Sequence, residues 1–212
     1  MEHDATRIVA IRHGQTAWNA ASRIQGHTDI ALDATGLWQA ERLAEALAGD
    51  ELHAVYSSDL QRACATAAPL ARRQGLPTRL DAGLRERGFG AFEGLSFAQI
   101  EQRWPEQAAR WRQRDPDFGA HGGEVLRDFR ERVVAAVTRL ARAHPGRNIV
   151  LVTHGGVLDM LYREAARLAL DAPRTWQVPN AGINRLLHAD EGLVLVGWGD
   201  VGHLEGVPDE RL

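Results

Sequence analysis

The chain has 212 residues, of which 44% are hydrophobic and 25% charged, and its formal net charge is −3. This balance is typical of a soluble globular protein and excludes a disordered or membrane-spanning chain, and it provides no overall positive field to attract nucleic acid or anionic lipid. Cys64 is the only cysteine, so neither an internal disulfide nor a thiolate metal site can form, and we expect a reducing, cytoplasmic location.

Short apolar runs rich in β-branched residues alternate with amphipathic stretches along the chain. The runs predict strands at residues 8–11, 53–58, 148–154, 183–189 and 193–199. Apolar residues at i, i+3 and i+4 spacing predict helices at 36–49, with Leu37 on the apolar face and Gly49 as the stop, and at 124–146. This alternation indicates an α/β fold, a three-layer α/β/α sandwich whose central sheet is mostly parallel.

We expect a single domain over residues 1–212, because no linker rich in proline, serine or glycine divides the chain. The segment at 96–123 is polar, rich in arginine and interrupted by Pro105 and Pro116. We interpret it as a helical insertion above the strand ends, where a lid or a specificity element would lie. Its Arg, Trp and Phe side chains are equally compatible with an ordinary solvated helix face.

Two predicted strands end in a histidine followed by glycine, at His13 and at His154. In a parallel sheet, ligands bind at the carboxyl ends of the strands. One such histidine alone is most simply a buried, hydrogen-bonded residue at a strand end. Two matched cases, with a helix beginning at "GGVLDML", direct free N–H groups and a helix dipole at one place, and they favour an anion site.

Two further charged residues follow predicted strands. Arg62 lies in the first turn of a helix that Ser58 or Asp59 can cap, where a cation is unfavourable, so it either pairs with a nearby acid or helps to bind an anion. Glu86 lies in the glycine-rich turn "LRERGFGAFEG". A lone glutamate in a loop is usually solvated, and it gains a functional meaning only if it shares a cleft with the histidines.

Five sequence blocks therefore stand at predicted strand ends or in the loops that follow. They are Arg12-His13-Gly14 with Thr16 and Asn19, "RIQG" at 23–26, "SSDLQRA" around Arg62, "LRERGFGAFEG" around Glu86, and "VTHGG" around His154. In this order they resemble the histidine phosphatase superfamily, also called phosphoglycerate mutase-like. RHG alone is a weak pattern, whereas five ordered blocks over about residues 7–160 are specific. The later "PNAGINRLLH" and "WGDVGHL" resemble the phosphatase branch.

The resemblance implies how the main residues act. His13 is expected to accept the phosphoryl group as a neutral nucleophile, which forms a phosphohistidine. Arg12, Arg62 and His154 are expected to surround the phosphoryl oxygens with positive charge. Glu86 is expected to protonate the leaving group and then to activate the hydrolytic water.

The resemblance also implies supporting contacts. Asn19 and the backbone of Gly155 would donate to the phosphate, and Gln25 and Gly26 would meet the leaving group, although these two could equally form a simple turn. No cofactor and no metal is expected, because a phosphohistidine mechanism needs neither. The remaining histidines match no ligand spacing and are interpreted as surface or packing residues: His27, His121, His188 and His203.

We interpret the chain as a phosphomonoesterase of the histidine acid phosphatase type that acts on a small phosphorylated substrate. The alternative is a cofactor-dependent phosphoglycerate mutase. Mutases have a tyrosine where this chain has Phe89, and a lysine that meets the substrate carboxylate where it has Phe97. Their double-arginine segment has no clear counterpart, although Arg110, Arg112 and Arg114 could partly replace it. A third hypothesis is a protein that binds a phosphorylated ligand without turnover.

Other classes and partners are less well supported. The chain has no GxxxxGK[ST] loop of an ATPase and no GxSxG elbow of a serine hydrolase. Sugar phosphates, phosphoserine, phosphoglycerates and the nucleotide-loop phosphate of cobalamin synthesis all stay open as substrates. No nucleic acid and no membrane is expected as a partner, and a homodimer stays open, since an exposed sheet edge could pair two subunits.

Overall fold

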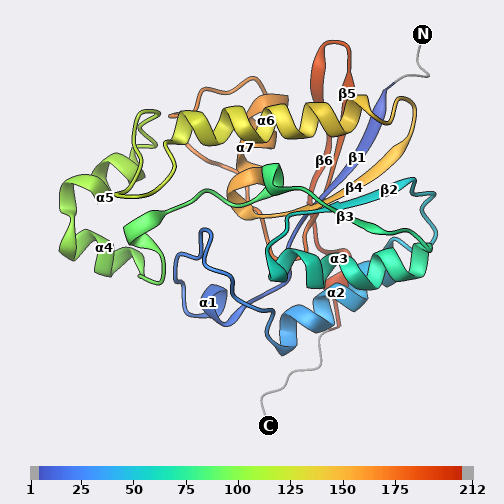
Figure 1. Ribbon diagram of the computed structural model, residues 1–212, viewed down its shortest axis with the longest axis horizontal. Helices are drawn as coiled ribbons and strands as arrows, with labels where there is room; N and C mark the ends of the chain where they lie inside the picture. Colours follow the sequence, from blue (N-terminus) through green and yellow to red (C-terminus); the bar gives the residue numbers. More distant parts are fainter. Residues whose placement is uncertain (1–4, 207–212) are drawn as a thin grey trace.

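A six-stranded sheet forms the centre of the computed structural model, which describes residues 5–206 (Figure 1). From edge to edge the strands are β3 (Thr78–Leu80), β2 (Ala54–Ser57), β4 (Asn148–Thr153), β1 (Thr6–Arg12), β5 (Ile183–Ala189) and β6 (Gly192–Asp200). β1, β2, β3 and β4 run parallel to one another, and β5 is antiparallel to both of its neighbours. Only β5 is reversed, so the prediction of a mostly parallel sheet is confirmed.

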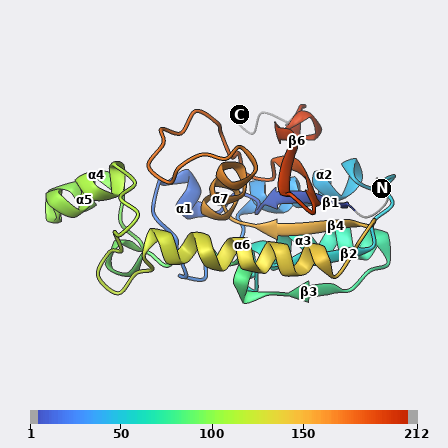
Figure 2. The same ribbon diagram turned by 90° about the horizontal axis from the view of Figure 1, so that it is seen from above.

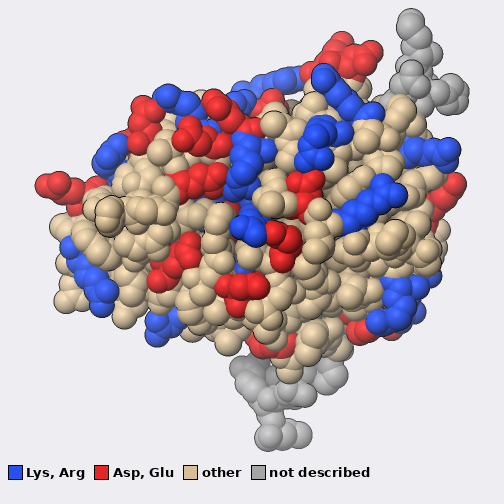
Figure 3. All heavy atoms as spheres, in the orientation of Figure 1, with Lys and Arg blue, Asp and Glu red and all other residues tan. Residues whose placement is uncertain are grey.

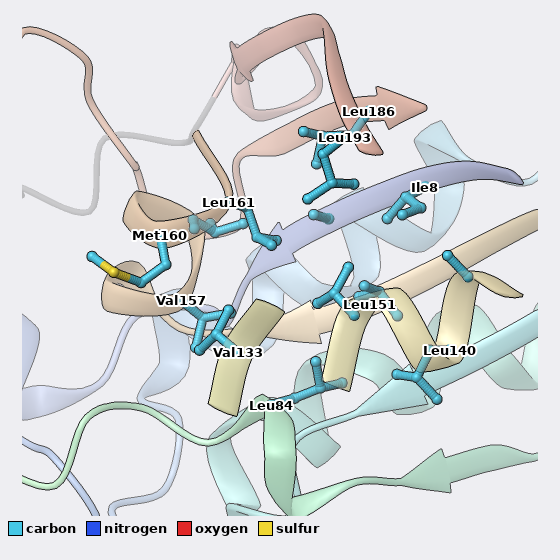
Figure 4. Packing of buried hydrophobic residues seen from close by; sticks show 14 of the residues in the cluster. Ile8, Leu84, Val133, Leu140, Leu151, Val157, Met160, Leu161, Leu186 and Leu193 are labelled. Carbon is cyan, nitrogen blue, oxygen red and sulfur yellow. The ribbon is translucent and has the colours of Figure 1, made fainter. Parts of the chain in front are cut away.

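Helices cover both faces of the sheet, which confirms the predicted three-layer sandwich. They are α2 (Ala34–Ala46) and α3 (Gln61–Gln74) on one face, and α6 (Leu126–Arg142) and α7 (Gly155–Ala165) on the other. Alternate strand residues divide between the two cores, since Ile8 packs with α6 and α7 and Val9 with α2 and α3. Figure 4 shows the first core, where Leu151 of β4 lies among Val133 and Leu140 of α6. A shift of one residue would exchange the two faces, so this packing fixes the register of the strand ends.

The segment at 96–123 lies beyond one end of the sheet in both ribbon views (Figures 1 and 2). Its helices are α4 (Phe97–Arg103) and α5 (Pro105–Arg112). It shares a small apolar core with the preceding loop: Phe92, Ile100, Ala108, Phe118 and Ala120. The segment is therefore helical as predicted, and its role as a lid stays a prediction.

Short elements complete the chain between the main layers. They are α1 (Ala17–Ala20) and three turns of 3₁₀ helix, η1 (Ala82–Leu84), η2 (Gly90–Phe92) and η3 (Gly202–Leu204). Within residues 5–206, no helix is both long enough and apolar enough to cross a membrane. The expected domain of residues 1–212 includes positions 1–4 and 207–212, which lie outside the described residues.

The first predicted helix is α2, and it begins and ends earlier than predicted. The Asp33 side chain caps it by accepting a hydrogen bond from Gly36 N at 2.8 Å. The helix ends three residues before Gly49, so Gly49 is not the stop that the sequence suggested. Leu37 is 55% exposed, because α2 faces the sheet with the row that includes Leu43.

The predicted cap of α3 is wrong. The helix starts after Leu60, and no side chain caps it. Asp59 instead accepts two hydrogen bonds from Arg85, at 2.6 and 2.5 Å, and these lower the pKa of Asp59. The Ser58 hydroxyl lies 2.8 Å from His154 Nε2. Both polar residues therefore serve contacts that are distant in sequence rather than the helix beside them.

Gly36 and Gly49 provide a matched test of this packing. A β-carbon on Gly36 would overlap the carbonyl oxygen of Gln15, whereas one on Gly49 would have nothing within 4 Å. We expect Gly36→Ala to lower the free energy of unfolding by about 1–3 kcal/mol, as overpacking does. Gly49→Ala should leave it unchanged or raise it by up to about 1 kcal/mol. Urea unfolding followed by circular dichroism measures both, and equal effects would contradict the close approach of α2 to the loop after β1.

Candidate active site

A cavity of about 420 Å³ opens where the parallel strands end. Eight of the nine predicted site residues line it: Arg12, His13, Asn19, Gln25, Gly26, Arg62, Glu86 and Gly155. The ninth, His154, is fully buried behind His13, and their ring centroids are 5.1 Å apart. The fold thus gathers all nine predicted residues in one region.

His13 directly follows β1, and its ring is held in one orientation. Its backbone N–H donates to Thr153 O at 2.8 Å, which continues the pairing of β1 with β4. Its Nδ1 lies 2.7 Å from Gly14 O. Because a carbonyl oxygen can only accept, Nδ1 carries the proton, and Nε2 keeps a lone pair. Burial first, and then the charges of Arg12 and Arg62, hold the pKa of His13 well below its usual range.

His154 follows β4 and caps the start of α7 without a side-chain hydrogen bond to that helix. Its Nε2 lies 2.8 Å from Ser58 Oγ, while its buried Nδ1 has no hydrogen-bond partner within residues 5–206. Burial, followed by the proximity of His13 and Arg62, holds the pKa of His154 well below its usual range. A buried nitrogen without a hydrogen-bond partner costs free energy unless a ligand forms that hydrogen bond. His154 Nδ1 is therefore available for a hydrogen bond to a ligand.

Two arginines face the cavity and are held by backbone carbonyls. Arg12 Nη1 donates to Val178 O at 2.7 Å, and Arg62 Nη2 and Nη1 donate to Gly26 O at 2.8 Å and Thr28 O at 3.0 Å. The Nε of each arginine is buried without a hydrogen-bond partner in the described chain. Within residues 5–206, Arg62 makes no ion pair with an acid, so the structure rejects the salt bridge that the sequence left open for this residue. Both guanidinium groups keep their positive charge for a ligand.

Glu86 is fixed against the first turn of α7. Its Oε2 accepts from Gly156 N at 2.9 Å, and its Oε1 accepts from Arg87 N at 2.9 Å. A β-carbon on Gly156 would overlap this carboxylate, so only glycine allows the approach. Glu86 therefore shares a cleft with His13, and this is the condition under which the sequence analysis gave the glutamate a functional meaning.

The turn that carries Glu86 is clamped from α6. Arg132 donates to the carbonyl oxygens of Glu86, Arg85 and Gly83 at 3.2, 3.1 and 3.0 Å, and it is itself paired with Glu124. His27 Nε2 lies 2.8 Å from Glu86 O. His27 is exposed, as expected of a surface residue, and its ring contacts the backbone of the turn that carries Glu86.

The predicted side-chain contacts Asn19 and Gln25 are both hydrogen-bonded to Thr16. Thr16 N donates to Asn19 Oδ1 and Thr16 Oγ1 donates to Gln25 Oε1, both at 3.1 Å. These contacts engage the acceptor end of each amide and leave its NH₂ group as the end that can donate into the cavity. Gly155 is the first residue of α7, so its N–H has no partner within the helix.

Several charged residues of the cavity were not predicted as site residues from the sequence. They are Arg23, Arg87, Arg114, Asp159 and Arg174. Asp159 interrupts the apolar run of α7, and that interruption was a usable signal. Arg114 was suggested only as a replacement for a mutase arginine, and nothing in the local sequence distinguishes Arg174.

The charge distribution is local rather than global. Figure 3 shows basic side chains (blue) mixed with Asp and Glu (red) over one face of the molecule. All of the blue side chains are arginines, because the chain contains no lysine. Within residues 5–206, no three His, Cys, Asp or Glu side chains are grouped in a way that could hold a metal ion. The positive charge of the site therefore comes from arginines in the cavity.

Comparison with known proteins identifies the family. Residues 8–201 match the model of the histidine phosphatase superfamily (branch 1). The chain belongs to this superfamily. The resemblance inferred from the five sequence blocks is thereby confirmed.

Relatives within the superfamily include phosphatases. Phosphoglycerate mutase-like protein 4 of Arabidopsis thaliana is 40% identical over 208 residues, which cover 95% of this chain and 88% of the relative. A metal-independent phosphoserine phosphatase of the same organism is 35% identical over 210 residues, covering 98% and 87%. The solved structure of a mycobacterial glucosyl-3-phosphoglycerate phosphatase in complex with VO3 matches with a TM-score of 0.82 at 34% identity, covering 91% of this chain and 98% of that one.

Acid should destabilise the protein through His13 and His154. The pKa of each is lowered in the folded state from a reference value of 6.5, so below about pH 6.5 the unfolded chain binds protons that the folded chain does not. The free energy of unfolding keeps the full contribution of these two histidines above this pH. Below it, that free energy should fall by up to about 1.4 kcal/mol per pH unit for each histidine. Urea unfolding between about pH 7.5 and 5, in buffers without phosphate or sulfate, measures the slope.

Two variants serve as controls for this pH dependence. His154→Gln should show a shallower slope than the wild type, because one of the two buried imidazoles of the site is gone. His121→Gln should keep the wild-type slope, because His121 is exposed. Parallel curves for the wild type and His154→Gln would contradict the assignment of acid sensitivity to the site.

Proposed function

We propose that this protein is a phosphomonoesterase that hydrolyses a small phosphorylated metabolite through a phosphohistidine intermediate on His13. The observation that carries the proposal is the hydrogen bond from His13 Nδ1 to Gly14 O. It leaves the Nε2 lone pair free in a cavity lined by Arg12 and Arg62, neither of which is neutralised by an acid within residues 5–206. A neutral imidazole beside unpaired guanidinium groups suits attack on a phosphate ester.

In the first step, His13 Nε2 attacks phosphorus, a P–N bond forms and the P–O bond to the leaving group breaks. Glu86, entering as the acid, gives its proton to the leaving oxygen, so an alcohol departs. Arg12 and Arg62 balance the charge on the transferring oxygens, and His154 Nδ1–H donates to one of them while Ser58 donates to His154 Nε2. The unpartnered nitrogens of these three groups supply the donors.

In the second step, water attacks the phosphohistidine. Glu86, now a carboxylate, takes a proton from the water, the new P–O bond forms and the P–N bond breaks. Inorganic phosphate leaves, and His13 is again neutral with its proton on Nδ1. The hydrogen bonds from Gly156 N and Arg87 N keep Glu86 in place through both steps.

The helical segment at 96–123 contributes a wall of the cavity in this proposal. Trp111 of α5 and Arg114 line the cavity, and Phe89 lies beside Trp111 with ring centroids 5.5 Å apart. An apolar wall and a charged group so close to Glu86 suit recognition of the leaving group. We therefore assign the segment to covering and selecting the leaving group.

The second candidate is a cofactor-dependent phosphoglycerate mutase, and the kinship with a phosphoglycerate mutase-like protein favours it. Two features weigh against it. Phe97, at the mutase lysine position, packs against Trp111 with ring centroids 5.6 Å apart and the rings tilted by 41°, and the chain has no lysine. Among the suggested replacements, Arg110 pairs with Asp115 and Arg112 with Glu101, and only Arg114 lines the cavity.

Loss of His13 should abolish turnover. We expect His13→Ala to lower kcat for release of inorganic phosphate by about 10³-fold or more, because the nucleophile is absent. The assay uses p-nitrophenyl phosphate and a panel of phosphomonoesters, with and without EDTA, and the wild-type rate should not depend on the chelator. The control His121→Ala, at an exposed position outside the cavity, should keep the wild-type rate.

The same enzyme preparation separates the alternatives. Isomerisation of 3-phosphoglycerate with added bisphosphoglycerate, at a rate that exceeds phosphate release, would overturn the phosphatase in favour of the mutase. An equal rate of phosphate release in the wild type and His13→Ala would overturn the nucleophile. Phosphate binding by calorimetry without any turnover would indicate the non-catalytic binding protein.

Glu86→Gln should affect substrates according to their leaving groups. We expect kcat for alkyl phosphates to fall by about 10²–10⁴-fold, because the departing alkoxide needs a proton. The loss should be much smaller for the first step with p-nitrophenyl phosphate, whose phenolate departs without one. Burst kinetics in a stopped-flow instrument isolate that step, and Glu106→Gln on α5 serves as the matched control. Equal losses of the first-step rate for both kinds of substrate would contradict the role of Glu86 as the acid.

A further inference from the structure

A buried carboxylate and three arginines meet in the part of the cavity formed by α7 and the loop that follows it. Asp159 on α7 is only 3% exposed, yet it lines the cavity. Its ion pairs are with Arg114, Arg163 and Arg174. Three positive charges against one negative charge leave this group with a net charge of +2.

Two of the three arginines have evident structural duties. Arg163 is fully buried, donates from Nε to Asp159 Oδ2 at 3.2 Å and from Nη1 to Ala169 O at 2.7 Å. Arg114 binds the same Asp159 oxygen and donates from Nε to Leu170 O at 2.8 Å. These contacts join α7, the following loop and the end of α5.

Arg174 is different because neither of its terminal NH₂ groups makes a hydrogen bond within residues 5–206. Its Nε donates to Trp176 O at 2.9 Å and lies 3.8 Å from Asp159 Oδ1, too far for a hydrogen bond. Its side chain is 38% exposed and lines the cavity. Arg12 and Arg174 line the same cavity. Burial is the main cause that lowers the pKa of Arg12, Glu86 opposes it, and the charge of Arg174 adds to the lowering.

Asp159 Oδ1 also lacks a hydrogen-bond donor. It is buried and has no hydrogen-bond partner within residues 5–206, whereas Oδ2 is bound by two arginines. An ionised oxygen in this state is costly unless a ligand donates to it. Within the described residues, the group thus presents guanidinium N–H groups and a carboxylate oxygen that have no hydrogen-bond partner, side by side.

The location is right for a leaving group. Glu86, the proposed acid, is bound to Gly156 at the start of α7, and Asp159 lies three residues further along the same helix. At a rise of 1.5 Å per residue, Gly156 and Asp159 are about 4–5 Å apart along the helix axis. Asp159 thus lies about the length of a two- or three-carbon fragment from the residue that holds Glu86.

We propose that Arg174, with Arg114, binds the carboxylate of the leaving group and that Asp159 Oδ1 accepts a hydrogen bond from a hydroxyl or ammonium group beside it. The substrate class is then an O-phosphorylated hydroxy acid or amino acid. This assignment rests on the proposed phosphatase function and adds to it the recognition of the leaving group. A second phosphate, which has no donor at neutral pH for Asp159 Oδ1, fits the position less well than a carboxylate with a neighbouring donor does.

The test compares substrates that differ by one group. Phosphoserine and phosphoethanolamine differ by the carboxylate, as do 3-phosphoglycerate and glycerol 3-phosphate. A charge-assisted contact contributes about 1.5–3 kcal/mol, so kcat/KM of the wild type should favour the carboxylate-bearing member of each pair by about 10- to 100-fold. Comparison of 3-phosphoglycerate with the phosphate ester of 3-hydroxypropanoate, which lacks the 2-hydroxyl group, tests the contact to Asp159 in the same way.

Arg174→Gln should reduce this preference to within about threefold, with the loss falling on the carboxylate-bearing member of each pair. Arg167→Gln is the matched control, because Arg167 lies in the same loop, donates to Glu191 O and does not line the cavity. It should keep the wild-type preference. Equal losses for both members of a pair in Arg174→Gln, or no preference in the wild type, would overturn the carboxylate site.

The outcome is distinguishable from failure of the proposed function. Hydrolysis of p-nitrophenyl phosphate that depends on His13, without a preference for carboxylates, overturns this assignment alone. If no hydrolysis depends on His13, the proposed function fails, and calorimetric titration with 3-phosphoglycerate and glycerol 3-phosphate still decides the site. Tighter binding of 3-phosphoglycerate that is lost in Arg174→Gln supports the site, and equal dissociation constants overturn it.

Discussion

The site depends on gathering positive groups around a neutral histidine with few acids to balance them. At a separation of 4 Å and an effective dielectric constant of about 20, two like charges repel by about 4 kcal/mol. The fold limits this repulsion by keeping His13 and His154 neutral through burial, and by giving Arg12 and Arg62 carbonyl oxygens instead of carboxylates. The remaining repulsion disappears only when an anion enters. The proposed binding of a phosphate group therefore follows from how these charges are held together.

Precise placement comes from elements on both faces of the sheet. On one face, Thr66 of α3 accepts from Gly14 N at 2.9 Å and donates to Arg62 O at 2.7 Å, which joins the loop of His13 to the helix of the arginine. On the other face, Arg132 of α6 holds the turn that carries Glu86. His13 and Glu86 are thus held from opposite faces of the sheet, and they meet because the helices of both faces pack on strands that end at the same edge.

The sequence predicts the framework well because its signals are local. The five predicted strands lie within two residues of their observed ends, since β-branched runs leave little choice of conformation, most clearly in β2 and β4, which are buried on both faces. His13 and His154 could be predicted because each directly follows a strand, and the topology brings strand ends together. Glu86 follows η1 rather than a strand, so its role could be predicted only from the resemblance to the family. Helix ends were less predictable. The Asp33 side chain caps α2 and sets its start at Ala34, before the first residue that was predicted, and Gly49 lies in a turn beyond the end of the helix.

The part of the site that sequence reasoning missed depends on contacts between distant segments. Arg114 and Asp159 are 45 residues apart, and Arg174 stands in a loop without a regular pattern. Ser58 and Asp59 show the same limit, because each left its predicted cap for a partner elsewhere in the fold. A polar residue near a helix start predicts a cap only if no better partner arrives from another element.

Asp159 connects recognition to the architecture of the helical segment. Its Oδ2 binds Arg114, whose backbone adopts the left-handed conformation (φ 56°) just after α5, so the carboxylate ties that segment to α7. Its Oδ1 has no hydrogen-bond partner within residues 5–206, so one oxygen has a structural role and the other is available for the proposed contact with the ligand. Replacement of Arg174 would change the preferred leaving group while the tie between α5 and α7 persists. Replacement of Asp159 would remove both and leave Arg163 buried without its counter-ion, so selectivity in this fold can diverge through the loop more easily than through the helix.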